Sequence, residues 1–246
     1  MEILTRENQT QQNQISIDVG TKIEELRQEW KEFNYRNSKR MPAILLSYPD
    51  FKNLLVAFGS KYLVSRGESI KFEIFPQNED VIFNIYRYFR RDSSFVGDLN
   101  KGILLNGAYG TGKTTLMNAI MGVYNYCTEL DPDNRFALKM RIMKSDKIVE
   151  EYWKEDNQYT LNGFLNGLLV IDELGREQKE IMIYGNSVRP ITSLLHDRYD
   201  RGRTTFAISN FTMSNLSSDN HYGKMIGDRL RQMFNEITLK GDSLRK

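Results

Sequence analysis

The chain has 246 residues, of which 40% are hydrophobic and 27% are charged. These proportions are typical of a soluble globular protein, and they exclude collagen-like and wholly disordered chains. The formal net charge is +2, so overall electrostatics would not drive the chain onto DNA or onto an anionic membrane. Any contact with nucleic acid must therefore be local.

The sequence indicates a reducing, membrane-free setting. Its single cysteine, Cys127, excludes an intrachain disulfide, and we expect it to be a small buried hydrophobe. The longest apolar runs, such as residues 168–171, fall far short of the roughly 20 residues that span a bilayer. The N-terminus lacks the positive-then-apolar profile of a secretory signal. We therefore expect a cytoplasmic protein that makes no membrane contact.

The N-terminal part is expected to be a leader followed by a helix. Residues 1–20 include a polar tract at 7–14 with nothing to bury, which predicts a flexible leader. Thr21 and Glu24 form a capping-box pattern, which predicts an amphipathic helix over residues 21–34. The apolar face of this helix is Ile23, Leu26, Trp30 and Phe33.

Two further helices are expected before residue 95. Asp50 can cap the first of them, and Asn78 opens the second. Arginines at the end of the second helix suit the helix dipole. The apolar positions are Leu54, Leu55, Phe58 and Tyr62 in the first helix, and Val81, Ile82, Ile85 and Phe89 in the second.

From residue 101 onward, short apolar runs alternate with helical stretches. This alternation predicts an α/β fold with a mainly parallel sheet that is covered by helices on both faces. The expected strands are 103–106, 136–142, 168–171, 204–209 and 236–239. The expected helices begin at Gly112 and Ser145 and lie around 190–201 and 222–234.

A phosphate-binding loop follows the first expected strand and opens a helix, as the pattern G-x-x-x-x-G-K-[ST] requires. Its glycines let backbone N–H groups face phosphate oxygens, and the helix N-terminus adds its positive dipole end. The lysine would reach the β- and γ-phosphates, and the first threonine would ligate Mg²⁺. The expected ATP-binding residues are Gly107, Ala108, Tyr109, Gly110, Thr111, Gly112, Lys113, Thr114 and Thr115.

Two adjacent acids, Asp172 and Glu173, end the buried run at 168–171, so they lie at the sheet edge where α/β folds bind ligands. Asp172 is placed to hold Mg²⁺ together with Thr114. Glu173 is the natural general base for a water that attacks the γ-phosphate. On its own, such a pair also fits a solvated strand end. Its position after the phosphate-binding loop favours the catalytic interpretation, and the second acid favours hydrolysis over phosphoryl transfer to a small acceptor.

Three further residues are candidates for the same chemistry. Asn210 ends the fourth expected strand, where its amide could orient the water or sense the γ-phosphate; the alternative is that it begins a turn. Arg229 and Arg231 lie two apart on a predicted helix, so they point to different sides. One of them could be an arginine finger that stabilises phosphoryl charge at a neighbouring subunit. The alternative is that both are solvated.

Taken together, these motifs resemble the AAA+ ATPases of the DnaC-like helicase-loader and IstB-like transposition-helper group. The resemblance implies a P-loop NTPase fold of the AAA+ (ASCE) class, a three-layer αβα sandwich. Its five-stranded sheet would have the order 5-1-4-3-2, and no separate helical lid domain would follow. The resemblance covers about residues 100–246 and rests on 107–114, 168–175, 204–210, 228–230 and 241–245.

The resemblance also implies roles and a domain division. Asn210 would be sensor 1, and Arg229 would be the finger acting in trans, so that the ATP site is complete only in an ATP-dependent homo-oligomer. Whether Arg229 or Arg231 is the finger stays open. The expected parts are the flexible leader 1–20, a helical partner-binding region 21–95, and the AAA+ ATP-binding domain 96–246.

The implied function is Mg²⁺-dependent ATP hydrolysis by a protein that loads a replicative DNA helicase onto single-stranded DNA. The alternative is an IstB-like ATPase that assists a transposase on double-stranded DNA. A phosphoryl-transfer enzyme acting on a small acceptor is a third hypothesis. The adenine contacts are expected in Phe72–Asn78. Candidate DNA contacts, which could equally be core or solvated residues, are Arg198, Arg201, Arg203, Tyr152, Trp153 and Tyr159.

Overall fold

The fold was analysed in a computed structural model of the chain. It describes residues 18–69, 71–131, 137–152, 154, 158–183 and 185–243. Trp153 and Arg245, and most of the predicted leader, lie outside the described residues, as do the side chains of Phe33 and Tyr159.

The centre of the molecule is a five-stranded parallel sheet. Its order is β2-β3-β6-β1-β7, which is the predicted 5-1-4-3-2 when the five strands are numbered along the chain. Every neighbouring pair in this sheet is parallel. The strands are β1 Gly102–Asn106, β2 Met140–Lys144, β3 Leu168–Asp172, β6 Thr205–Ile208 and β7 Phe234–Thr238.

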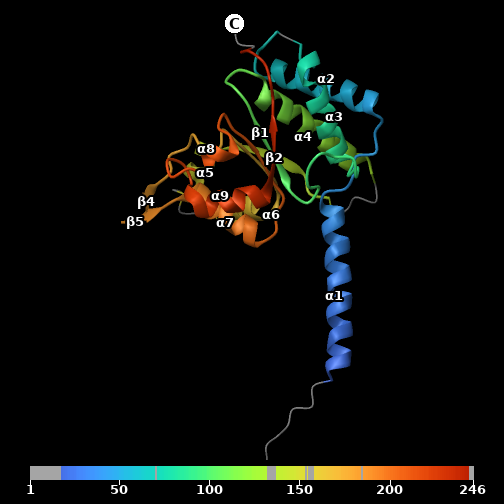
Figure 1. Cartoon of the computed structure of the whole chain (residues 1–246), viewed down its shortest axis with the longest axis vertical. Helices are drawn as coiled ribbons and strands as arrows, with labels where there is room; N and C mark the ends of the chain where they lie inside the picture. Colours follow the sequence, from blue (N-terminus) through green and yellow to red (C-terminus); the bar gives the residue numbers. More distant parts are fainter. Residues whose placement is uncertain are drawn as a thin grey trace, which may run out of the picture.

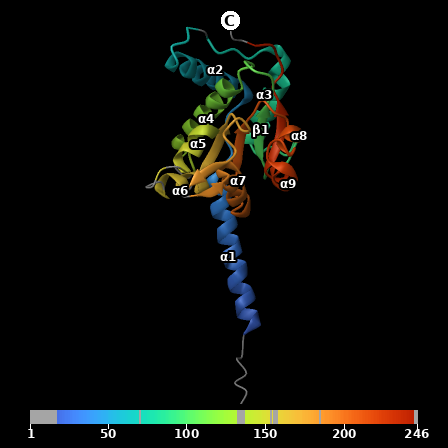
Figure 2. The same cartoon turned by 90° about the vertical axis from the view of Figure 1, so that its left-hand side faces the viewer.

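Helices cover both faces of the sheet, so the predicted three-layer αβα sandwich is confirmed (Figures 1 and 2). Alternate strand residues point to opposite layers: Leu105 packs with one group of helices and Leu104 with the other. The first group is α2 Tyr48–Ser65, α3 Glu79–Phe89 and α4 Lys113–Leu130. The second is α5 Ser145–Tyr152, α6 Gln158–Asn166, α7 Pro190–Asp200, α8 Met213–Leu216 and α9 Gly223–Met233.

Several sequence predictions need correction. The strand predicted over 136–142 is β2, which runs to Lys144, and the last strand begins at Phe234 rather than at 236. Two helices, α5 and α6, stand where one was expected. A hairpin of β4 Ile181–Ile183 and β5 Asn186–Val188 was not predicted at all. Its strands are three residues each, too short to show a period, and it is anchored by the buried Ile181.

The N-terminal helix starts earlier than expected. Helix α1, Val19–Arg40, is capped by Asp18, whose side chain accepts hydrogen bonds from the N–H groups of residues 20 and 21. Thr21 therefore lies inside the helix, and the capping-box prediction is wrong. Similarly, α2 is capped by Ser47 rather than by Asp50, which occupies the third helical position. In both cases a nearby Ser or Asp offered the same cap one turn upstream.

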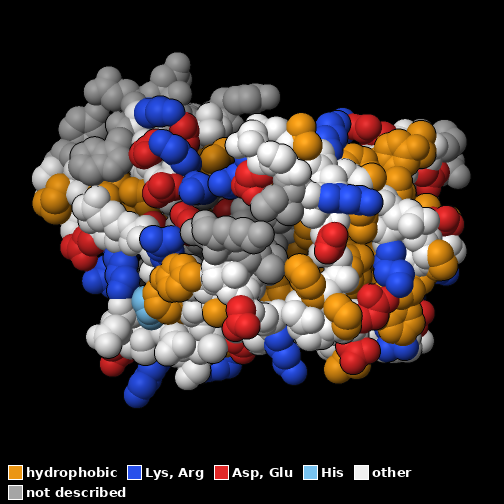
Figure 3. Space-filling model, turned by 90° about the horizontal axis from the view of Figure 1, so that it is seen from above, with side chains coloured by type: hydrophobic (Ala, Val, Ile, Leu, Met, Phe, Trp, Pro, Cys, Tyr) orange, Lys and Arg blue, Asp and Glu red, His pale blue; other side chains and the backbone are white. Residues whose placement is uncertain are grey.

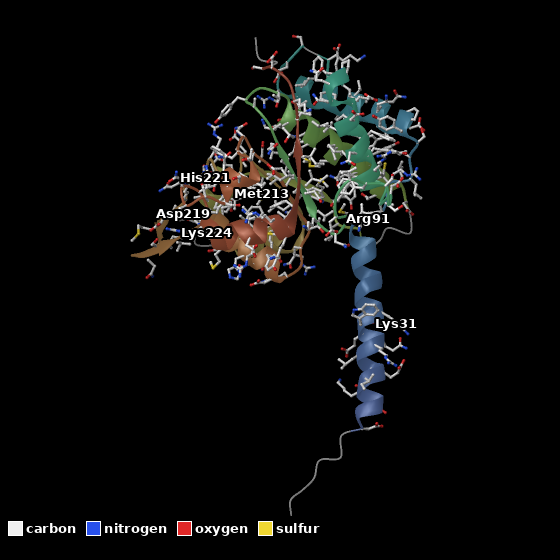
Figure 4. The ribbon with its side chains drawn as sticks, viewed as in Figure 1. Lys31, Arg91, Met213, Asp219, His221 and Lys224 are labelled. Carbon is white, nitrogen blue, oxygen red and sulfur yellow. The ribbon has the colours of Figure 1, made fainter. Side chains whose placement is uncertain are left out.

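Helix α1 extends away from the body of the molecule (Figures 1 and 2). Three residues of its predicted apolar face are exposed: Ile23 by 45%, Leu26 by 51% and Trp30 by 66%. Lys31 lies along the same projecting helix (Figure 4). By contrast, α2 and α3 share one hydrophobic core with the sheet and α4. Helix α1 thus stands apart from the αβα fold.

Two expectations from composition can be compared with the structure. Cys127 is half-buried rather than fully buried, and its partial burial raises the pKa of the thiol. Within the described ranges, none of the helices is both long and apolar enough to cross a membrane. Viewed from the end opposite α1, acidic and basic side chains are interspersed over the surface (Figure 3), in keeping with the small net charge.

Candidate nucleotide-binding site

The predicted phosphate-binding loop connects β1 to α4. The loop spans 107–112, and Lys113, Thr114 and Thr115 form the first turn of α4. Gly107 has φ 146°, and a Cβ there would lie 2.4 Å from the carbonyl oxygen of Leu239, so only glycine fits. The helix N-terminus presents its N–H groups at the carboxyl edge of β1, where an anion is favoured. All nine predicted ATP-binding residues therefore lie in one continuous cradle.

Lys113 is held inside this loop. It is only 6% exposed, and its Nζ donates hydrogen bonds to the carbonyl oxygens of Gly107 at 2.8 Å and Ala108 at 2.6 Å. Thr111 closes the same turn by donating to the Ala108 carbonyl. The ammonium is thus already positioned at the loop that would hold phosphates, and its side chain is ordered.

Asp172 lies against the start of α4. Its carboxylate oxygens are 3.2 and 3.3 Å from Oγ1 of Thr114, so the two expected Mg²⁺ ligands meet, although β3 and the strand that precedes α4, β1, are separated by β6. Asp172 is 3% exposed. Burial raises the pKa of its carboxyl group, and the hydrogen bond from Thr114 opposes this shift. A carboxylate and a hydroxyl side by side are oxygen ligands of the kind that Mg²⁺ prefers.

Glu173 adopts a strained backbone conformation, with φ at 59°. Such a left-handed conformation costs a non-glycine residue on the order of 1 kcal/mol and needs support from its surroundings. Here the Glu173 N–H donates to Asp172 Oδ1, and Ser145 Oγ donates to the Glu173 carbonyl. The Glu173 side chain forms ion pairs with Lys144 at 3.4 Å and Arg176 at 3.3 Å.

Lys144, Ser145 and Arg176 were not identified from the sequence. Lys144 ends β2, beside the acids that end β3. Because β2 was predicted to stop at residue 142, the rule that strand ends gather at one edge was not applied to Lys144. Arg176 also lies over the ring of Tyr109, at 5.7 Å, and so links the phosphate-binding loop to Glu173.

Asn210 is the second residue after β6, which lies between β3 and β1. Ser209 fixes this strand end: its N–H donates to the Leu105 carbonyl, and its hydroxyl donates to the Leu174 carbonyl. Asn210 is half-buried at the carboxyl edge of the sheet. Its role at the γ-phosphate stays a prediction.

The arginine candidates take different surroundings. Arg229 on α9 is half-buried and lies over the ring of Tyr199 in its own subunit, whereas Arg231 is exposed. His221, Asp219 and Lys224 lie near the start of α9, on the side away from α1 (Figure 4).

The predicted DNA contacts are corrected in part. Arg198 is fully buried and donates to Thr205, to the carbonyls of Phe164 and Gly167, and to Thr204, so it is a structural residue. Tyr152 packs against the second hydrophobic core. Arg201 is exposed, and Arg203 is half-buried.

The segment predicted to contact adenine lies near the phosphate-binding loop. The Asn78 side chain accepts from the Lys240 N–H at 3.0 Å and donates to the Lys240 carbonyl at 2.8 Å. The chain then continues past Gly110, where an added Cβ would lie 2.2 Å from Ser243 Oγ. Phe72, at the other end of the predicted segment, packs against α2 at Gly59.

One family model, described as the C-terminus of D-glucuronyl C5-epimerase, matches residues 136–242. That match covers less than half of the chain and begins after the phosphate-binding loop and α4. No curated protein matches the chain.

Solved structures share the fold. DnaI is 20% identical, with a TM-score of 0.51, covering 85% of this chain and all of that one. A primosome component from Streptococcus pyogenes serotype M3 is 16% identical, with a TM-score of 0.51 and coverage of 85% and 98%. The DnaC helicase loader is 19% identical, at a TM-score of 0.49 and coverage of 70% and 94%. The predicted AAA+ P-loop fold, and the resemblance to DnaC-like proteins at the level of the fold, are confirmed.

Proposed function

We propose that the chain is a Mg²⁺-dependent ATPase. The observation that carries this proposal is the contact between Thr114 and Asp172, with Glu173 next in sequence, at the mouth of a phosphate-binding loop. A strand that only served the fold would not need a buried acid and a strained acid at its end, beside a glycine-rich loop that carries a lysine.

In this proposal each residue has one task. Lys113 binds the β- and γ-phosphates, and the first turn of α4 adds its N–H groups. Thr114 and Asp172 hold Mg²⁺, which neutralises phosphate charge when it is bound. Glu173 accepts a proton from the attacking water, and Asn210 orients that water. Glu173 must leave at least one of its ion pairs with Lys144 and Arg176 to do so.

The test is a comparison of Glu173→Gln with wild-type protein. The variant should bind ATP with unchanged affinity and lose turnover by about a hundredfold or more, because general base catalysis is removed. Glu180→Gln is the matched control, since Glu180 is an exposed acid on the following segment, paired with Arg189. Normal turnover by Glu173→Gln would overturn the assignment.

We further propose that this ATPase loads a replicative DNA helicase onto single-stranded DNA, as an ATP-dependent homo-oligomer. The fold shared with DnaI and with a primosome component supports this function. The place of α1 supports it as well. This helix projects from the body at the amino edge of the sheet, away from the phosphate-binding loop, and its exposed apolar face is free for a partner to dock.

The partner is tested with Glu173→Gln as bait in extracts of the source cell. With ATP bound and turnover blocked, it should retain a replicative helicase, whereas Lys113→Ala should not. Leu26→Ser with Trp30→Ser should lose the helicase yet still bind ATP, because only the exposed face of α1 is changed. Capture of a transposase without a helicase would favour the IstB-like alternative on double-stranded DNA.

A further inference from the structure

The guanidinium of Arg229 rests on an aromatic ring. Its Cζ lies 5.5 Å from the centroid of the Tyr199 ring, which belongs to the neighbouring helix α7. Both helices cover the second face of the sheet (Figures 1 and 2). A ring face attracts a cation without neutralising it. Arg229 therefore keeps its charge while its side chain is held in place.

One donor of this guanidinium is buried without an acceptor. Nη1 of Arg229 is shielded from solvent and has no hydrogen-bond partner in the part of the chain that the structure describes. Buried donors are normally satisfied, so an exception needs an explanation. Arg198, one residue before Tyr199, shows that the fold can satisfy an arginine fully, since its Nε, Nη1 and Nη2 all have oxygen acceptors. Arg229 as a whole is only half-buried, so part of its side chain reaches solvent, and among the described residues no oxygen acceptor contacts its guanidinium. The exposed part of the guanidinium therefore keeps hydrogen-bonding capacity that suits an anion.

The ring under Arg229 is itself fixed to α9. Tyr199 donates its hydroxyl to Gln232 Oε1 at 2.6 Å, and Gln232 Nε2 donates to Asp228 Oδ2 at 3.1 Å. Asp228 and Gln232 are one helical turn apart, on either side of Arg229 in the sequence. The carboxylate of Asp228, the acid nearest to Arg229 in sequence, thus accepts from Gln232, and within the described ranges it forms no ion pair with Arg229.

We propose that Tyr199 is a positioning residue for Arg229. Its ring holds the guanidinium in one orientation and leaves it unneutralised, so that it can meet the γ-phosphate of ATP bound to a second copy of this chain. The inference rests on the proposed oligomeric ATPase, with Arg229 as the trans-acting arginine that the resemblance implies, and it adds the residue that positions this arginine. Holding a long, flexible side chain beforehand reduces the entropy lost when it engages the phosphate.

The experiment measures ATP turnover as a function of protein concentration, and the affinity of the dilute subunit for an ATP analogue. Arg229→Ala should lower kcat on the order of a thousandfold. Tyr199→Leu should lower it about ten- to a hundredfold, because the finger is misplaced rather than lost. Tyr199→Phe keeps the ring and should recover most of that loss. None of these variants should change analogue affinity. Tyr126→Leu, which alters an exposed tyrosine on α4, is the control.

The decisive variant combines Tyr199→Leu with Arg229→Ala. If Tyr199 acts through Arg229, the double variant should turn over ATP no more slowly than Arg229→Ala alone. An equal further loss in that background, or wild-type kcat for Tyr199→Leu, would overturn the inference while leaving the trans-acting arginine intact. Wild-type kcat for Arg229→Ala would instead remove that arginine from the proposed function, and the inference with it.

Discussion

The two edges of the parallel sheet treat their polar side chains in opposite ways. At the amino edge, Arg198 is buried with an oxygen acceptor for each of its nitrogens, and Asn235 donates to the carbonyls of Asp98 and Gly102. At the carboxyl edge, Asp172 is buried with a raised pKa, and Glu173 is strained. The amino edge satisfies its buried polar groups, whereas the carboxyl edge holds a buried acid and a strained residue beside the phosphate-binding loop, as is typical of a ligand site.

The largest expected effect is on binding at the carboxyl edge. Lys113→Ala should weaken ATP binding by at least about a hundredfold, because the buried ammonium that meets the phosphates is removed. Its unfolding midpoint without nucleotide should change little by comparison. Titration with a fluorescent ATP analogue checks this, with Lys147→Ala, an exposed lysine of α5 paired with Glu150, as the control. Retained affinity in Lys113→Ala would break the contrast between the two edges.

The next effect is on stability at the amino edge. Arg198→Leu should lower the free energy of unfolding by about 3 kcal/mol, because several buried oxygens lose their donor. Burial lowers the pKa of this guanidinium to about 9, so it is still charged at neutral pH. Denaturant unfolding measures the loss, and Arg201→Leu, an exposed arginine three residues on, should cost less than about 0.5 kcal/mol. Equal losses in the two variants would contradict the structural role.

A smaller loss of stability is expected at Glu177, a buried acid on the carboxyl side of the sheet that has hydrogen-bond partners. Glu177 accepts hydrogen bonds from the Gly175 N–H and from the hydroxyl of Tyr222, just before α9. Burial raises the pKa of Tyr222 well above its usual range, so the phenol stays protonated and keeps donating. Tyr222→Phe should cost about 1–2 kcal/mol of stability. Thermal unfolding would show it, with Tyr126→Phe unaffected; an unchanged midpoint would mean that Glu177 needs no partner.

The smallest expected effect is a gain in stability rather than a loss. Because the folded pKa of Asp172 lies above its ordinary value, the folded state holds this proton more tightly than the unfolded chain does. Nucleotide-free protein should therefore lose stability as the pH rises from the unfolded pKa through the folded one. Asp172→Asn should raise the unfolding midpoint at neutral pH, and the gain should vanish on acidification. The same variant should lose stabilisation by Mg²⁺ and ATP. A lowered midpoint would contradict this sign.

The sequence predicted the parts of the fold that local chemistry dictates. The loop at 107–114 has a fixed spacing, and each of its glycines has a positive φ, so its place between β1 and α4 was predicted correctly. Its binding of ATP stays a prediction. The acid pair followed from a run of buried residues that stops at two charges. The sheet order came from the resemblance, since strand pairing between distant segments leaves no local signal.

The parts that were missed depend on tertiary contacts. In the sequence, Arg198 is an arginine of the kind that binds DNA phosphates. Its burial becomes visible only from the packing of α6, α7 and β6 around it. Likewise, the spacing of Arg229 and Arg231 shows that the two side chains point to different sides of a helix, but it does not show what either of them contacts. Tyr199 belongs to no sequence motif, and its contact with Arg229 is seen only once α7 is packed beside α9.

The pairing of β1 with β7 bears on how this protein is made. Asn106 and Glu236 are 130 residues apart in sequence, yet they are joined by a side-chain hydrogen bond across adjacent strands. Leu239, which follows β7, closes against the phosphate-binding loop. A ribosome therefore completes the lysine-bearing loop long before it supplies the strand that borders it. Since such distant pairings form slowly, the emerging chain should acquire the proposed affinity for ATP last, after most of its helices have formed.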